Sequence, residues 1–188
     1  AFHGTGGPAC ARQHHRALGG DAIGWHDGEW IERPGGSGRE LFWFPEPIGG
    51  KDCYRAELAD PIVLHRAFPN VNRISARVSA TRRDRLTARL PMMSPPHPEG
   101  GLGGIRVEVR GSLAGARVTH VAGIAERTAV IAGAVASSVA DQLQGLVTNG
   151  GVPAGVVVLG DGRLDETALM TAVIQRGIKV FEYIGAAG

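Results

Sequence analysis

The chain has 188 residues, which is enough for one well-buried domain but short for two full domains. Hydrophobic residues make up 43% and charged residues 20% of the chain, an ordinary globular composition that argues against intrinsic disorder. The formal net charge of +2 is too small to imply nucleic-acid or membrane binding through the net field, and we expect neither partner.

The cysteine content and the apolar stretches indicate the compartment. Cys10 and Cys53 are the two cysteines, too few for a disulfide framework, which is typical of a reducing environment. No basic-then-apolar signal peptide is present, and the apolar stretch at 128–140 is shorter than the roughly 20 residues of a spanning helix. We therefore expect a soluble, cytoplasmic protein.

The chain begins with a Gly-rich N-terminal segment at 1–37 that contains a short hairpin and is continuous with the domain at 38–188. Residues 4–9 have the G-x-G-x-x-A spelling of a dinucleotide loop. That mechanism needs a strand ending at the first glycine, and three residues before Gly4 leave no such strand. We expect a plain loop here, with no cofactor-binding residue.

The Asp27-Gly28 pair in that segment predicts a hairpin turn between strands at 22–25 and 30–32. Leu41–Phe44 predicts a compact buried strand, stopped by prolines.

The next helix and strand are defined by capping and alternation. Asp60 is expected as the N-cap of a helix with Pro61 at its first position, and Leu64 and Phe68 are expected to face the core. Alternation from Ile74 to Val78 predicts a strand with one buried face.

The remaining elements follow from periodicity and from Gly and Pro stops. A helix runs from a Thr81–Asp84 capping box to about Leu90, followed by a loop at 92–104 and an antiparallel hairpin of strands at 105–109 and 118–122. A helix at 127–146 is stopped by Asn149–Gly151. The last elements are a strand at 155–159, a helix at 165–176 with Leu169, Val173 and Ile174 on its core face, and a strand at 180–184. Long antiparallel strands with interspersed helices predict an α+β fold: a mixed, largely antiparallel sheet covered by helices, with no Rossmann half.

Arginines are the most informative polar residues. The stretch from residue 73 to residue 89 contains six arginines and one acidic residue, Asp84. Arginine binds carboxylates through two parallel hydrogen bonds, so Arg82, Arg83 and Arg85 are candidate substrate-binding residues. The alternative is a solvated helix face. No aromatic residue lies inside the stretch, which disfavours nucleic acid.

Histidines suggest two further sites. His97, in the loop 94–101, is a candidate catalytic residue if that loop covers a substrate, and the alternative is an ordinary surface loop. His14 and His15, with His3 and His26 nearby, invite a metal hypothesis, but no metal-ligand spacing supports it. We expect solvated histidines and no metal.

Small residues recur on the long helix at Ala129, Gly133 and Ser137. Such a row lets another backbone approach closely, either a sheet of the same chain or a second copy. It predicts core or interface and no cofactor site.

The order of these pieces resembles the saccharopine dehydrogenase-like oxidoreductases over residues 20–185. The resemblance rests on an F-P-x-P-x-G…Y pattern at 44–54, the Asp60-Pro61 helix, the strand end at 123–128 and the closing segments at 155–159 and 180–182. It implies the C-terminal substrate-binding and dimerisation domain of an NAD(P)-dependent enzyme acting on a C–N bond of an amino-acid derivative.

The resemblance also implies partners. NAD or NADP would be bound by an N-terminal Rossmann domain that is not in this sequence, so we expect no cofactor in this chain and no activity from it alone. A homodimer and a small-molecule carboxylate substrate are expected, with Arg82, Arg83 and Arg85 holding carboxylates and Tyr54 or His97 assisting proton transfer. The alternative is a stand-alone, non-enzymatic dimerisation or small-ligand-binding module.

Overall fold

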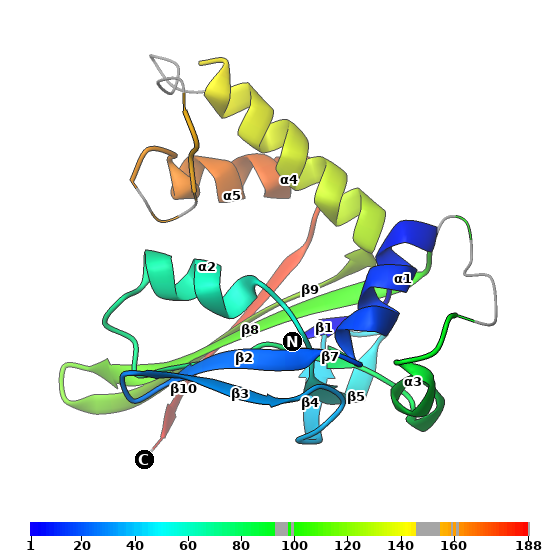
Figure 1. Cartoon of the computed structure of the whole chain (residues 1–188). Helices are drawn as coiled ribbons and strands as arrows, with labels where there is room; N and C mark the ends of the chain where they lie inside the picture. Colours follow the sequence, from blue (N-terminus) through cyan, green and yellow to red (C-terminus); the bar gives the residue numbers. More distant parts are fainter. Residues whose placement is uncertain (93–97, 99, 146–154, 159, 161, 188) are drawn as a thin grey trace.

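The computed structural model describes residues 1–92, 98, 100–145, 155–158, 160 and 162–187 (Figure 1). Within these residues the largest element is a seven-stranded sheet in the order β10-β9-β8-β1-β7-β5-β4. Its strands are β1 (Phe2–His3), β4 (Glu40–Phe44), β5 (Gly49–Arg55), β7 (Arg77–Ser79), β8 (Leu102–Leu113), β9 (Ala116–Arg127) and β10 (Val180–Ala187). β1 and β7 are parallel, and the other neighbouring pairs are antiparallel. The predicted α+β class with a mixed, largely antiparallel sheet is confirmed.

A smaller sheet of the described residues contains β3 (Glu29–Pro34), β2 (Asp21–His26) and β6 (Arg73–Ile74). Its hairpin turns at Asp27-Gly28, as predicted, with φ angles of 49° and 92°. Both angles lie in the left-handed region, which a two-residue hairpin turn matched to the strand twist requires.

The strand predicted at Ile74–Val78 is divided between the two sheets. β6 pairs with β2 of the smaller sheet, whereas β7 pairs with β1 and β5 of the larger one. Ile74, Ala76 and Val78 are buried, as the alternation predicts. The pattern therefore identifies the buried face, but the chain leaves one sheet and enters the other at Ser75.

Five helices occur in the described part of the chain. They are α1 (Pro8–Ala17), α2 (Asp60–Ala67), α3 (Arg82–Thr87), α4 (Thr128–Leu143) and α5 (Glu166–Gln175). Figure 1 shows α4 and α5 together above the β8–β9 hairpin, and α2 on the same side farther along it.

The start of α3 is the predicted capping box. The Thr81 hydroxyl accepts the backbone N–H of Asp84 at 3.2 Å, and the Asp84 carboxylate accepts the Thr81 N–H at 2.8 Å. The expected extension to Leu90 is wrong, because the Leu90 N–H bonds the Thr87 carbonyl in a tight turn. The N-cap of α2 is Ala59 rather than Asp60, because the first helical N–H groups bond the Ala59 carbonyl.

The predicted β8–β9 hairpin is confirmed and is longer than the pattern indicates, pairing from Leu102↔Arg127 to Leu113↔Ala116. α4 follows β9 directly and packs on this hairpin. Its core cluster contains Ile131, Ala134, Val173 and Ile178, with Ile105 and Ile124 of the sheet packed against them. α4 ends at Leu143, before the expected stop at 149–151, which lies outside the described residues.

Several apolar side chains expected in the core are exposed. Leu64 and Phe68 of α2 are 41% and 56% exposed, and Ile174 of α5 is about half exposed, while Leu169 and Val173 are buried as predicted. Helical spacing shows which residues share a face, but it does not show whether another element covers that face.

The predicted strands at 41–44 and 155–159 also need correction. β4 is an edge strand: Phe44 is buried, whereas Leu41 and Trp43, which alternate with it, are exposed. Residues 155–158 form no strand and pair with none of the described strands, and residue 159 lies outside them.

The N-terminal loop corrects another expectation, because a strand does precede Gly4. β1 ends at His3, lies between β8 and β7, and leads through the glycines into α1. The glycines allow close backbone packing: a Cβ on Gly4 would lie 2.7 Å from the Gly103 Cα, and one on Gly103 would lie 2.8 Å from the His3 carbonyl oxygen. Backbone from 100–103 thus packs closely against one side of this loop.

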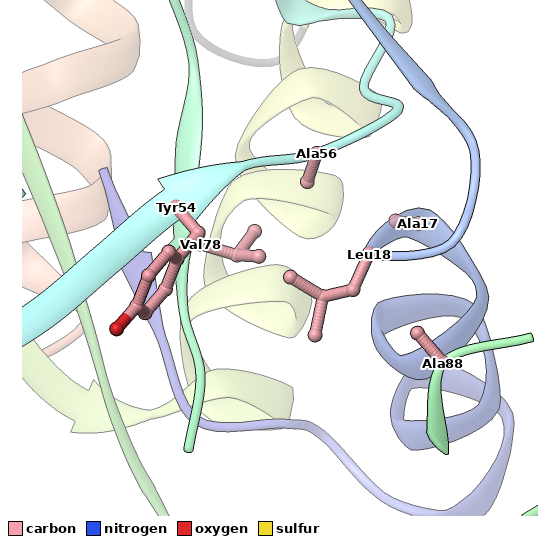
Figure 2. Packing of buried hydrophobic residues seen from close by; sticks show 6 residues of the cluster. All are labelled: Ala17, Leu18, Tyr54, Ala56, Val78 and Ala88. Atoms are coloured by element: carbon pink, nitrogen blue, oxygen red, sulfur yellow. The ribbon is translucent and has the colours of Figure 1, made fainter. Parts of the chain in front are cut away.

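The second core cluster lies between the end of α1 and the larger sheet (Figure 2). It contains Ala17, Leu18, Tyr54, Ala56, Val78 and Ala88. Leu18 is its most completely enclosed large side chain at 2% exposure. No helix among the described residues has both the length and the apolar character needed to cross a membrane.

Replacing Leu18 with Ala is expected to lower the free energy of unfolding by about 2–5 kcal/mol, because the buried side chain leaves a cavity. Leu86→Ala is the matched control, since Leu86 is 72% exposed and its loss is expected to change stability by less than about 0.5 kcal/mol. Urea denaturation of both variants measures the difference, and equal effects would contradict the assigned core.

Candidate functional site

A depression of about 790 Å³ lies where β1, β5 and β7 meet α1 and α3. Its polar lining includes His3 of β1, His14 of α1, Arg39, Lys51 of β5, Ser79 of β7 and Asp84 of α3. These residues are brought together by the pairing of β1 with β7 and of β7 with β5.

Ser79 is bonded to both histidines. His3 Nδ1 lies 2.6 Å from the Ser79 hydroxyl, and His14 Nε2 lies 2.9 Å from the Ser79 carbonyl oxygen. A carbonyl can only accept, so His14 Nε2 carries the hydrogen. The hydroxyl can either donate to His3 or accept from it, so the contact is compatible with either neutral tautomer of His3.

The environment lowers the pKa of both imidazoles below the ordinary value. For His3 the largest cause is loss of hydration, and the charge of Lys51 and the nearby His14 act in the same direction. For His14, loss of hydration outweighs the hydrogen bond to Ser79 and the charge of Asp84, which raise the pKa. Both rings are therefore mainly neutral at pH 7, and His14 Nδ1 is unprotonated.

Lys51 is the basic residue of the depression that lacks a carboxylate partner. Arg39 Nε lies 2.9 Å from the Asp52 carboxylate, which neutralises that pair. The Asp84 carboxylate accepts hydrogen bonds from the Thr81 N–H and hydroxyl, at 2.8 and 2.7 Å. Lys51 forms no ion pair with any residue that the structure describes, so an ammonium group without a carboxylate partner lies beside His3.

Tyr54 and Arg85 lie together, away from this lining. Tyr54 is buried in the core cluster, where Figure 2 shows its ring beside Val78. The Arg85 guanidinium carbon lies 4.2 Å from the centre of the Tyr54 ring, and Arg85 Nη1 donates to the Gly36 carbonyl at 3.4 Å. This stacking ties α3 to the core and gives both residues a packing role.

The other candidate residues are not brought together with Tyr54. Arg82 and Arg83 are exposed at the start of α3 and form no ion pair with a described residue. Their neighbours Thr81 and Asp84 line the depression, which places the two arginines next to its wall. His97 lies outside the described residues.

The expectation of solvated histidines is wrong for α1. His15 is buried and its Nε2 donates to the Leu90 carbonyl at 3.1 Å, while His14 bonds Ser79 on the other side. His3 and Ser79 are 76 residues apart in sequence, so no local motif could have joined them. Within the residues described, no group of three His, Cys, Asp or Glu side chains could hold a metal ion.

A scan against protein-family models finds no match to this chain, and a search of curated proteins finds none either.

The lowered pKa of His14 predicts a pH-dependent stability. Because the unfolded chain binds a proton at the ordinary pKa of 6.5 and the folded chain only at lower pH, the unfolded state holds more protons in between. The stabilisation is complete above about pH 6.5 and is lost as the pH falls through the folded-state pKa.

We expect His14→Asn to flatten this dependence, measured as the slope of unfolding free energy against pH between about 5 and 7. Gln13→Asn, at an exposed residue of α1 that carries no titratable group, is the control and should keep the original slope. A histidine NMR titration that places the pKa of His14 at or above 6.5 would contradict the assignment.

Proposed function

We propose that the depression binds a carboxylate-bearing small molecule, and that the chain is the substrate-binding and dimerisation half of a saccharopine dehydrogenase-like NAD(P)-dependent oxidoreductase. The observation that carries the proposal is the combination of Lys51 with neutral His3 and Ser79 in one depression. The reaction class, at a C–N bond of an amino-acid derivative, rests on the sequence resemblance.

The ammonium group of Lys51 supports a carboxylate ligand. An ammonium group offers three donors, and hydrogen bonds from charged donors to carboxylates are about twice as strong as neutral ones. Lys51 has no carboxylate partner among the described residues, whereas Arg39 already pairs with Asp52. Arg82 and Arg83, beside the wall, are proposed as outer contacts for a second carboxylate.

His3 transfers the proton to or from the bound molecule. Its ring is neutral near pH 7, and the Ser79 hydroxyl is in hydrogen-bond contact with it. A neutral imidazole whose Nδ1–H donates to the Ser79 hydroxyl can accept a proton from the bound molecule at Nε2 and later return it from the same nitrogen. His14 acts differently, as a positioning residue that fixes the Ser79 backbone.

No dinucleotide site is proposed among the described residues. The loop with the dinucleotide-like spelling packs on one side against the backbone of residues 100–103 and borders the depression on another. Following the sequence resemblance, NAD or NADP is proposed to bind to a Rossmann domain outside this sequence.

Replacing Lys51 with Met tests the carboxylate site. Glutarate is expected to bind the 188-residue chain saturably, and Lys51→Met is expected to weaken it by at least about tenfold, or about 1.4 kcal/mol. Lys179→Met is the matched control, because Lys179 is the only other lysine and is exposed outside the depression. Isothermal titration calorimetry measures both. Absence of saturable binding, or equal loss in the two variants, would refute the proposal.

A second candidate is a non-enzymatic module that associates with a copy of itself. α4 supports it: Ala129, Gly133 and Ser137 are exposed, and a Cβ on Gly133 would meet nothing within 4 Å. The core side of this helix is instead formed by Ile131, Ala134, Ser138 and Gln142. The small-residue row thus does not contact the sheet of its own chain, and a second copy is the partner proposed.

Gly133→Arg tests this interface without weakening the helix, because arginine has a higher helix propensity than glycine by several tenths of a kcal/mol. Sedimentation velocity is expected to show a dimer for the parent chain and a monomer for the variant. Thr167→Arg, on the exposed side of α5, is the control and should remain dimeric. A monomeric parent chain would exclude this interface.

A further inference from the structure

A second, smaller pocket of about 50 Å³ lies at the junction of the two sheets, separate from the depression. Its wall includes four arginines: Arg33 of β3, Arg55 of β5, Arg73 of β6 and Arg77 of β7. None of the described residues that line the pocket is acidic. The pocket forms where the chain leaves the smaller sheet after Ile74 and enters the larger one as β7.

Strand pairing fixes the two inner arginines. Arg55 and Arg77 are directly opposite each other in the antiparallel β5–β7 pair. Arg77 is buried, its Nη1 bonds the Gly38 carbonyl, and its Nε lies 3.0 Å from the Glu40 carboxylate at an angle that makes no hydrogen bond. Arg55 Nη1 donates a long hydrogen bond of 3.4 Å to the Ser37 hydroxyl.

Gly38 permits this arrangement. A Cβ at this position would collide with the Arg55 guanidinium and would lie 3.1 Å from Arg77 Nη1. Its φ of 61° is in the left-handed region, which also favours glycine. The backbone at 38 therefore leaves open the space that the two guanidinium groups occupy.

The charges around the pocket are unbalanced. Glu40 pairs with Arg77, but Arg33, Arg55 and Arg73 form no ion pair with any described residue. Burial lowers the pKa of Arg77, Glu40 raises it, and the nearby Arg55 and Arg73 lower it further. Like charges held this close on strands are unfavourable unless an anion offsets them.

The size and the donor count indicate what kind of anion would fit. One water molecule needs roughly 10–15 Å³ of cavity volume, so this pocket of about 50 Å³ holds about three to five heavy atoms. One carboxylate is satisfied by a single guanidinium fork, whereas the three unpaired arginines offer more donors than its two oxygens accept. A phosphate group supplies more acceptor oxygens and a charge of about −1.5 to −2.

We propose that the pocket formed by Arg33, Arg55, Arg73 and Arg77 binds a phosphate group, either inorganic phosphate or the phosphate of a small phosphorylated molecule. The site is distinct from the carboxylate depression and does not depend on the function proposed for it. The arginines come from four strands of both sheets, so the bound anion links the sheets electrostatically.

Isothermal titration calorimetry of the 188-residue chain with inorganic phosphate, phenyl phosphate and glutarate tests the proposal. Saturable phosphate binding that Arg55→Gln weakens by at least about tenfold is expected. Arg117→Gln, at an exposed arginine of β9 that lines neither the pocket nor the depression, is the matched control and should bind phosphate like the parent chain. Tighter binding of phenyl phosphate than of inorganic phosphate would assign the site to a phosphorylated molecule, and the reverse would assign it to the free ion.

Arg73→Gln provides a second variant in which folding is not at risk, because the Arg73 side chain is exposed and forms no hydrogen bond or ion pair with a described residue. No saturable binding of either phosphate probe up to about 10 mM, or unchanged binding in both Arg55→Gln and Arg73→Gln, would overturn the proposal. Phosphate binding that Lys51→Met abolishes would also overturn it. Failure of glutarate to bind would affect only the carboxylate depression.

Discussion

The insertion of β1 into the middle of the larger sheet is the constraint on which the rest of the structure depends. Two residues, Phe2 and His3, pair with β8 on one side and with β7 on the other. They join the antiparallel group β8, β9 and β10 to the antiparallel group β4, β5 and β7. The same strand carries His3 to Ser79, so the continuity of the sheet and the geometry of the depression come from one pairing.

β7 supports two polar sites of different electrostatic character. Arg77 and Ser79 are two residues apart on this short strand and therefore lie on the same face. Arg77 belongs to a pocket of guanidinium groups that remain charged, whereas Ser79 contacts imidazoles that burial keeps neutral at pH 7. Burial thus removes charge from the histidine site but leaves it in the arginine pocket, because arginine holds its proton at any ordinary pH.

The sequence predicts those features that depend on neighbouring residues. The Asp27-Gly28 turn, the capping box at Thr81 and the β8–β9 hairpin all follow from local patterns, and the structure contains each of them. The α+β class follows from the same elements. The burial of Leu64 and Phe68 was predicted wrongly, because it depends on an element elsewhere in the chain that covers the helix, and none of the described elements does.

The candidate sites could not be predicted in the same way. Short-range reasoning selected Arg82, Arg83 and Arg85 because they cluster in sequence, but Arg85 stacks on Tyr54 and contributes to packing. His3 and Lys51 had no motif around them, and their proximity results from strand pairing between distant segments. The two-residue strand before Gly4 was overlooked because it is too short to show alternation, and its pairing depends on the strands on either side.

The position of β1 also has a consequence for the order in which the chain can fold during synthesis. Phe2 is synthesised before its partners Val78 and Ile105. At about 5–20 residues per second, β1 waits about 5–20 s for Ile105 of β8. During that time the β4–β5 hairpin can form, but β1 cannot yet join the two halves of the sheet. The synthesis of β8 is therefore the step that allows the two halves to join through β1.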